Sequence, residues 1–193
     1  MIGKLAALLD KYGKIQNVIL FIMLIIPFNA LIFPTMSGHF RDLAHGLGTL
    51  DPDFGYLPQT ALDHIFAYGA PARAYYLLIE WTADLAYPFI YSTLFALLLT
   101  FILHRAFPPQ SPYQRLHLVP YAMMVCDYSE NILVSLLLLT YPAQSIFLAW
   151  IASIASFLKW MFGGMVVLSL LISIIALFAA LIREAQEPRG GSS

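Results

Sequence analysis

Three polar side chains interrupt an apolar stretch of this sequence at "VCDYSENILV", residues 125–134. Asp127, Glu130 and Asn131 are spaced i, i+3 and i+4, so on a helix they share one face. A charged side chain near the centre of a bilayer costs at least about 2.5–3.5 kcal/mol on insertion scales. We therefore expect this face to point into the protein interior, where carboxyl groups can donate and accept protons.

A second polar stripe lies earlier in the chain. Its six members fall within an arc of about 80° when each residue turns a helix by about 100°; they are Arg73, Tyr76, Glu80, Asp84, Tyr87 and Tyr91. Pro88 removes the backbone hydrogen bond to the carbonyl of Asp84. The pattern therefore predicts a kink at the stripe and a free backbone acceptor beside a carboxylate.

Lys159 is the one cation expected deep inside the last apolar segment. Its helical face consists of small residues, which let neighbouring helices approach closely; they are Ala152, Ala155, Ser156 and Gly163. We expect Lys159 to reach the acids of the other two segments. Four acids (Glu80, Asp84, Asp127 and Glu130) then face two cations, Lys159 and Arg73. Two negative charges remain if all six ionise, so at least one acid is expected to hold a proton or to await a cationic ligand.

Composition predicts that these residues are carried by membrane-spanning helices. Of 193 residues, 60% are hydrophobic and 11% are charged, against roughly 25% charged in soluble domains. Four segments supply the roughly 20 apolar residues that a bilayer span needs: 16–34, 74–103, 117–140 and 145–182. The net charge of −1 gives no reason to expect nucleic acid, and the single Cys126 excludes an internal disulfide.

The expected fold is an all-α polytopic membrane protein, a four-transmembrane-helix bundle with a helical external loop. Residues 1–183 form a single domain, and residues 184–193 a flexible tail. The external lid, residues 35–73, is expected to contain short helices at about 38–46 and 58–68. Lys and Arg gather in the N-terminal flank, the loop after residue 103 and the tail, which places both termini on the cytoplasmic side of the inner membrane.

The depth of the polar residues predicts a pocket rather than a pore. The acids and Lys159 lie between the outer surface and the middle of the membrane, and the inner parts of the second and fourth segments are apolar, as in "LFALLLTFIL". We expect a pocket that opens outward or sideways into the outer leaflet.

The motifs resemble an uncharacterised family of small bacterial four-helix integral membrane proteins. That family has an R-x-x-Y-x-x-x-E-x-x-x-D-x-x-Y/F-P stripe, then D-x-x-E-N, then a Lys-aromatic pair, here Lys159 and Trp160. The resemblance covers about residues 50–165 and implies no function. The layout also resembles the EXPERA group, which includes the sterol isomerase and the sigma-2 receptor, through Glu80, Pro88 and a long first external loop. That resemblance implies an outer-leaflet pocket for sterols or cationic amphiphiles.

Several functions remain open at this point. An isomerase, hydratase or cyclase acting on a lipid or isoprenoid would use Asp127 or Glu130 as acid and Glu80 or Asp84 as base. Its ligand, a membrane lipid or hydrophobic small molecule, would meet Arg73, Tyr76, Tyr87, Tyr91, Asn131, Lys159 and Trp160. The alternatives are a non-catalytic binder, a proton or cation carrier, and an accessory subunit of a membrane complex or homo-oligomer. The polar residues could also serve only to fix helix register.

No cofactor and no metal are expected from the sequence. The histidines and the acid of the external segment match no metal-ligand spacing; they are His39, His45, Asp63 and His64.

Overall fold

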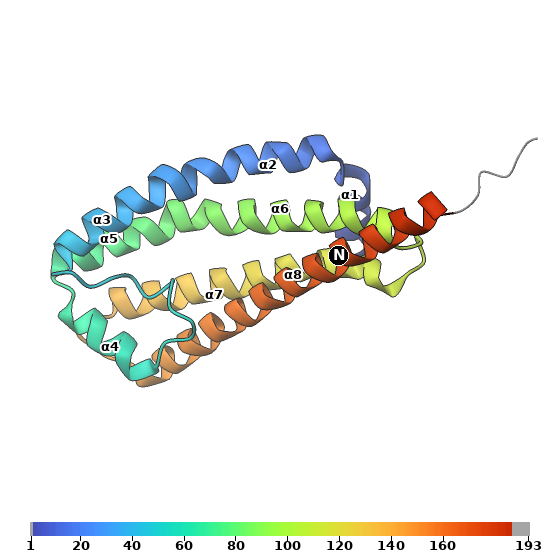
Figure 1. Cartoon of the computed structure of the whole chain (residues 1–193). Helices are drawn as coiled ribbons and strands as arrows, with labels where there is room; N and C mark the ends of the chain where they lie inside the picture. Colours follow the sequence, from blue (N-terminus) through green and yellow to red (C-terminus); the bar gives the residue numbers. More distant parts are fainter. Residues whose placement is uncertain (1, 187–193) are drawn as a thin grey trace, which may run out of the picture.

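The computed structural model describes residues 2–186, which contain helices and no strand (Figure 1). In chain order the elements are α1 (Ile2–Tyr12), α2 (Ile15–Pro27), the π-helical segment η1 (Phe28–Ile32), α3 (Phe33–Leu43), α4 (Pro58–Ala67), α5 (Ala70–Trp81), α6 (Ala83–Ala106), the 3₁₀ segment η2 (Pro112–Leu118), α7 (Val119–Leu139) and α8 (Ile146–Gln186). Four helical stretches are long and apolar enough to cross a membrane: Ile15–Leu43, Ala70–Ala106, Pro112–Leu139 and Ile146–Arg183. The predicted all-α class and the number of such stretches are therefore confirmed.

The first stretch is longer than the sequence pattern predicted. Pro34 lies in the first turn of α3, and the π-helical segment directly before it keeps the helical stretch continuous through this proline. The expected separate helix at 38–46 is wrong, because its first residues are the end of α3. The chain leaves α3 through His45 and Gly46, which both have positive φ (55° and 91°); this is a common way for helices to end.

The second stretch is interrupted, but not at the predicted position. The helical path breaks at Thr82 (φ −124°, ψ −80°), between α5 and α6. Pro88 lies inside α6. The Thr82 hydroxyl donates to the carbonyl of Leu78, a local bond that competes with the helical ladder. The break therefore divides the polar stripe between two helices.

The fourth stretch is a single helix of 41 residues, α8. At about 1.5 Å per residue it is roughly 60 Å long, twice the thickness of a bilayer core. A helix of this length would have to tilt in a bilayer or extend beyond its hydrocarbon core, as the sequence already predicted. The predicted tail began at residue 184, but α8 continues to Gln186; the rest of the predicted tail lies outside the described residues.

The segment that the sequence predicted to be external is part of the main hydrophobic core. The predicted helix at 58–68 is confirmed as α4, which packs against α8. Residues 44–57, here called the lid loop, contribute the fully buried Leu50 to a core shared with α3, α4, α5, α7 and α8 (Phe40, Leu62, Tyr76 and Val134 among others). Figure 1 shows the lid loop and α4 at one end of the molecule and α1 at the other.

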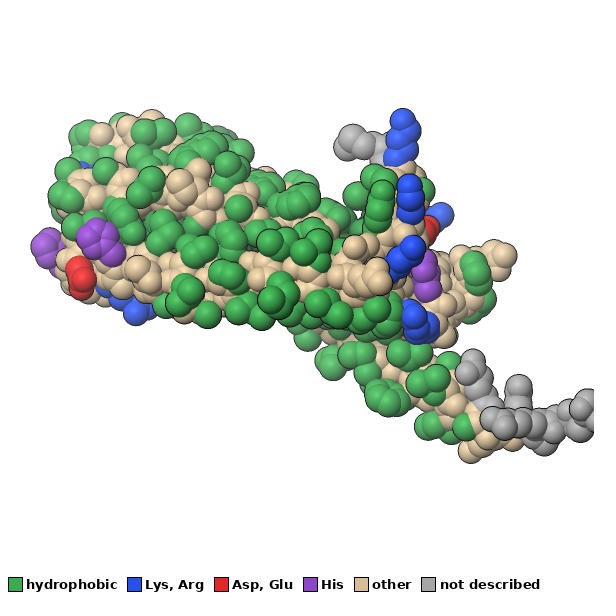
Figure 2. Space-filling model, turned by 90° about the horizontal axis from the view of Figure 1, so that it is seen from above, with side chains coloured by type: hydrophobic (Ala, Val, Ile, Leu, Met, Phe, Trp, Pro, Cys, Tyr) green, Lys and Arg blue, Asp and Glu red, His purple; other side chains and the backbone are tan. Residues whose placement is uncertain are grey.

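Side chains on the surface form distinct zones along the molecule. Figure 2 shows hydrophobic side chains covering the middle of one face, with Lys and Arg gathered at the end that carries α1. Large apolar residues are exposed along the long helices, including Met23, Leu31, Leu139 and Ile175. Such an extensive apolar surface marks an interaction with another apolar phase, and it is compatible with a membrane protein.

We expect the two ends of the molecule to lie on opposite sides of the inner membrane. Gln144, beside the lid, and Gln110, between α6 and η2, are both exposed. In a Cys126→Ala background, Gln144→Cys should react with an impermeant maleimide added to intact cells. Gln110→Cys should react only after permeabilisation. Labelling of Gln110→Cys alone in intact cells would invert the orientation, and labelling of both would contradict the four spans.

Candidate functional site

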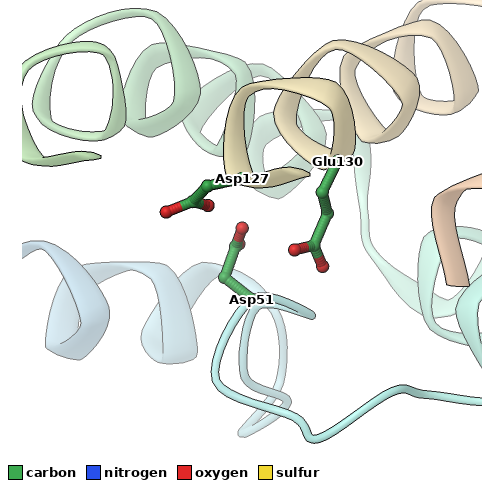
Figure 3. A group of neighbouring side chains, drawn as sticks. All are labelled: Asp51, Asp127 and Glu130. Atoms are coloured by element: carbon green, nitrogen blue, oxygen red, sulfur yellow. The ribbon is translucent and has the colours of Figure 1, made fainter. Parts of the chain in front are cut away.

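The centre of the candidate site is Asp51, a lid-loop residue that sequence reasoning missed. Figure 3 shows the side chains of Asp51, Asp127 and Glu130 pointing toward one another. One carboxylate oxygen of each lies within 4.8 Å of the other two; we call this group the α7 triad. Asp51, Glu80 and Asp84 meet the same limit and form the α5–α6 triad. Asp51 therefore joins the two acidic faces that the helical periodicity predicted.

Tyr76 holds Asp51 in place. Its hydroxyl donates to Oδ2 of Asp51 at 2.7 Å and accepts the backbone N–H of Leu50 at 2.8 Å. The Tyr76 side chain is fully buried. Tyr76 therefore positions the lid loop, and its predicted ligand-binding role stays a prediction.

The backbone of the lid loop also docks along α8. The carbonyl of Asp51 accepts Nζ of Lys159 at 3.2 Å, and the carbonyl of Asp53 accepts the Ser156 hydroxyl at 3.4 Å. The carbonyl of Tyr56 accepts the hydroxyl of Ser153. Donors spaced three residues apart lie along one face of a helix, so α8 fixes the course of the loop over several residues.

Tyr56 brings a further hydroxyl from the lid loop toward the acids. Its side chain is buried. Burial raises the pKa of this hydroxyl, and the negative charges of Glu130 and Asp51 raise it further. Tyr56 therefore remains a neutral phenol, able to donate a hydrogen bond beside Glu130. The sequence analysis gave it no role.

Lys159 is an internal counter-ion. Its Nζ lies 2.5 Å from Oε2 of Glu130 and 3.5 Å from Oδ1 of Asp127, and its side chain is buried. Oδ2 of Asp127 also accepts the hydroxyl of Tyr91 at 2.7 Å. Glu130 is thus the closer partner of Lys159, while Asp127 is shared between Lys159 and Tyr91.

Asn131 connects α7 to α6 through the acceptor that Pro88 leaves free. Its Nδ2 donates to the carbonyl of Asp84 at 3.2 Å. This is the backbone carbonyl that lacks a helical partner because proline has no N–H. The sequence predicted the free acceptor, although the break in the helix occurs at Thr82.

An open cavity of about 490 Å³ lies between the first helical stretch and α8. Its polar lining includes Asp51, Asp84, Asp127 and Lys159, and its aromatic lining includes Phe33, Tyr87, Tyr91, Phe95 and Trp160. Tyr87 donates to Oδ1 of Asn29, a residue of the π-helical segment, at 3.1 Å. A smaller cavity of about 270 Å³ is lined by Glu80, Trp81, Asp84, Leu85, Tyr128, Asn131 and Ile132. Asp84 lines both cavities.

Arg73 lies apart from this cluster. Its guanidinium donates to the carbonyls of Ile65 (3.3 Å) and Tyr68 at the end of α4. Its Cζ also lies 3.7 Å from the centre of the Tyr141 ring. Arg73 therefore caps α4 and stacks on an aromatic ring, and the expectation that it faces the acids is wrong.

The cluster carries more acid than base. The two triads and Lys159 together contain five carboxyl groups and one ammonium group, because Asp51 joins the four predicted acids and Arg73 lies elsewhere. Both carboxylate oxygens of the buried Glu80, and Oδ1 of Asp51, have no hydrogen-bond partner among the described residues. An unpaired buried charge is costly, so this arrangement favours bound protons or a cationic ligand.

Comparisons of the chain with protein-family models, with curated proteins and with solved structures found no match. The resemblances drawn from the motifs therefore stay hypotheses, and the geometry of the site carries the functional argument.

We expect Lys159→Met to lower the thermal stability of the detergent-solubilised protein. It leaves Glu130 and Asp127 buried beside an apolar side chain; losing one partner of a buried ion pair costs about 3–5 kcal/mol in soluble proteins, and less in a membrane bundle. Adding Glu130→Gln should recover part of the loss, and more than adding Asp127→Asn, because Glu130 is the closer partner. A merely additive Lys159→Met/Glu130→Gln variant would contradict this pairing.

Tyr76→Phe should loosen the lid loop. The change leaves the buried N–H of Leu50 without an acceptor, which costs about 1–3 kcal/mol, and it frees Asp51. Hydrogen–deuterium exchange of residues 44–57 should accelerate severalfold. Tyr75→Phe is the matched control, since the half-buried Tyr75 packs edge-on against His39. Equal exchange in both variants would show that Tyr76 does not hold the loop.

Proposed function

We propose that this protein binds an amphiphile within the inner membrane, with a cationic head group beside the acids and an apolar chain in the larger cavity. The observation that carries the proposal is the excess of carboxylates over cations at a cavity whose other walls are aromatic and aliphatic. Neutral or anionic head groups would leave that excess uncompensated.

Membrane insertion as a four-helix bundle is part of the proposal. Its support is the length and apolar character of the four stretches and the exposed apolar side chains along them. Lys4, Lys11, Lys14, Arg105 and Arg115 are exposed at the α1 end, which favours a cytoplasmic position for that end. The acids then lie toward the outer leaflet.

The packing of the helices favours sideways access for the ligand. α2 packs chiefly against α6, and the described residues show no comparably extensive contact of α2 with α8. The larger cavity lies between these two elements, where α2 contributes Ile25 and α8 contributes Trp160. An acyl or isoprenoid chain could therefore enter from the surrounding lipid without crossing the lid loop.

The polar end of the cavity suits an amine or a quaternary ammonium group. Asp51, Asp84 and Asp127 supply negative charge, and aromatic faces attract cations by about 0.5–2 kcal/mol. Tyr87, Tyr91 and Trp160 line the same space. Recognition would thus combine direct charge pairing with an aromatic wall.

Any proton transfer to or from this ligand would be carried out by the acids that line the cavity. Asp84 and Asp127 line the larger cavity, whereas Glu80 and Glu130 do not. Glu130 is also committed to Lys159 at 2.5 Å. We therefore narrow the earlier pairs of candidates to Asp127 as acid and Asp84 as base, with Lys159 setting the local charge.

A proton or cation carrier is less well supported. Toward the α1 end, the buried hydroxyls of Thr100, Ser169 and Ser173 each donate to the backbone of their own helix. The Thr100 hydroxyl also lies 3.3 Å from Nδ1 of His117 in η2, whereas Ser169 and Ser173, within the described residues, bond only inside α8. This favours a pocket that is closed toward the α1 end over a continuous polar path across the molecule.

Binding of radiolabelled dodecylamine to the protein in lipid nanodiscs tests the proposal. We expect saturable binding that dodecanol displaces at least tenfold less well than unlabelled dodecylamine, a difference of about 1.4 kcal/mol. Trp160→Ala should weaken binding by a similar factor. Trp150→Ala is the matched control, because Trp150 lies on the same helix and is exposed. Equal displacement by the alcohol, or equal loss in both variants, would reject a cationic ligand in this cavity.

A further inference from the structure

We propose that the α5–α6 triad, Asp51, Glu80 and Asp84, binds one divalent metal ion that prefers oxygen ligands, namely Ca²⁺, Mg²⁺ or Mn²⁺. This goes beyond the proposed amphiphile binding, because the ion would bind in the absence of any amphiphile.

The three carboxylates have the spacing of a cation site. One oxygen from each lies within 4.8 Å of the other two. Ca²⁺ binds oxygen at about 2.3–2.6 Å, so ligands on opposite sides of the ion are about 5 Å apart and adjacent ligands are closer. The side chains come from the lid loop, α5 and α6, and small rotations would bring all three to one ion.

The environment of Glu80 is independent evidence for a ligand at this triad. Its side chain is only 2% exposed, and neither carboxylate oxygen has a hydrogen-bond partner among residues 2–186. Within the described part of the chain, no Lys, Arg or His forms an ion pair with Glu80 or Asp84. A buried carboxylate with no partner, next to two further acids, is stabilised by an oxygen-preferring cation.

The α7 triad is less suited to a metal ion, although it shares Asp51. Lys159 already supplies a positive charge there, 2.5 Å from Glu130 and 3.5 Å from Asp127. A second cation in contact with the same oxygens would meet the repulsion of this ammonium group. Lys159 therefore neutralises negative charge in the α7 triad, and the proposed ion would neutralise it in the α5–α6 triad.

The smaller cavity provides room for the remaining ligands. Glu80, Asp84 and Asn131 line this space of about 270 Å³. In the described part of the chain, Oδ1 of Asn131 has no hydrogen-bond partner. Ca²⁺ and Mg²⁺ accept amide oxygens and water as ligands. The bound ion would tie the lid loop to α5 and α6 through Asp51.

Titration of the metal-depleted full-length protein in nanodiscs with Mn²⁺, followed by electron paramagnetic resonance, tests the proposal. We expect one saturable site per chain, with Ca²⁺ or Mg²⁺ competing. Glu80→Gln should weaken Mn²⁺ binding at least tenfold. Asp63→Asn is the matched control, because it also removes one carboxylate, from an exposed position on α4 outside both triads, and it should alter the affinity less than threefold.

Stability without the ion provides a second readout. Glu80→Gln removes an unpaired buried charge, so it should raise the melting temperature of the metal-depleted protein and abolish the increase that Ca²⁺ gives the parent. Asp84→Asn should also abolish that increase, and it serves as the test if Glu80→Gln does not fold.

Three results would overturn the ion site: no saturable Mn²⁺ binding to the parent, unchanged affinity in both Glu80→Gln and Asp84→Asn, or an equal loss of affinity in Asp63→Asn. Dodecylamine plays no part in these measurements. Failure of the ion site therefore leaves amphiphile binding standing, and failure of amphiphile binding leaves the ion site standing.

Discussion

The contact between Lys159 and Glu130 is the interaction on which the arrangement of the site depends. Both side chains are buried, so each charge needs the other far more than it would in water. The contact fixes the rotation and register of α7 against α8, which form the most extensive helix pair in the protein. With that register set, Asp127 meets both Lys159 and Tyr91, and Asn131 meets the free carbonyl of Asp84.

The lid loop depends on the same pair of helices. Lys159 also donates to the backbone of Asp51, and Tyr76 of α5 directs the Asp51 side chain inward. Asp51, which is far from the other acids in the sequence, is thereby shared by both triads. The loop is held by buried apolar contacts as well, through Leu50 and Tyr56. These contacts argue against a freely opening lid and in favour of ligand access between the helices.

Helical periodicity was sufficient to predict most of the site. The faces of Glu80 and Asp84, of Asp127, Glu130 and Asn131, and of Lys159 meet as the spacing indicated, because a buried helix must turn its charged face inward. Asp51 could not be predicted in this way, since loop residues have no periodicity and their position is set by distant partners. The acidic "DPDFG" of the lid was the only available signal. Arg73 is on the same helix as Glu80, but it lies about two turns nearer the start of α5. There its guanidinium contacts the end of α4 and does not reach the acids.

Charge balance relates the two proposed ligands to each other. Five carboxylates and one ammonium give the cluster a formal charge of −4 if all six groups are ionised. A divalent ion and a monovalent head group together still leave one negative charge, which a single bound proton neutralises, so the two ligands can be present at once. Asp84 lines both cavities and would serve each ligand. Two effects then oppose each other: repulsion between the cations disfavours joint binding, and the ordering of Asp51 by the ion favours it. Whichever dominates, thermodynamic linkage requires each ligand to change the affinity for the other by the same factor.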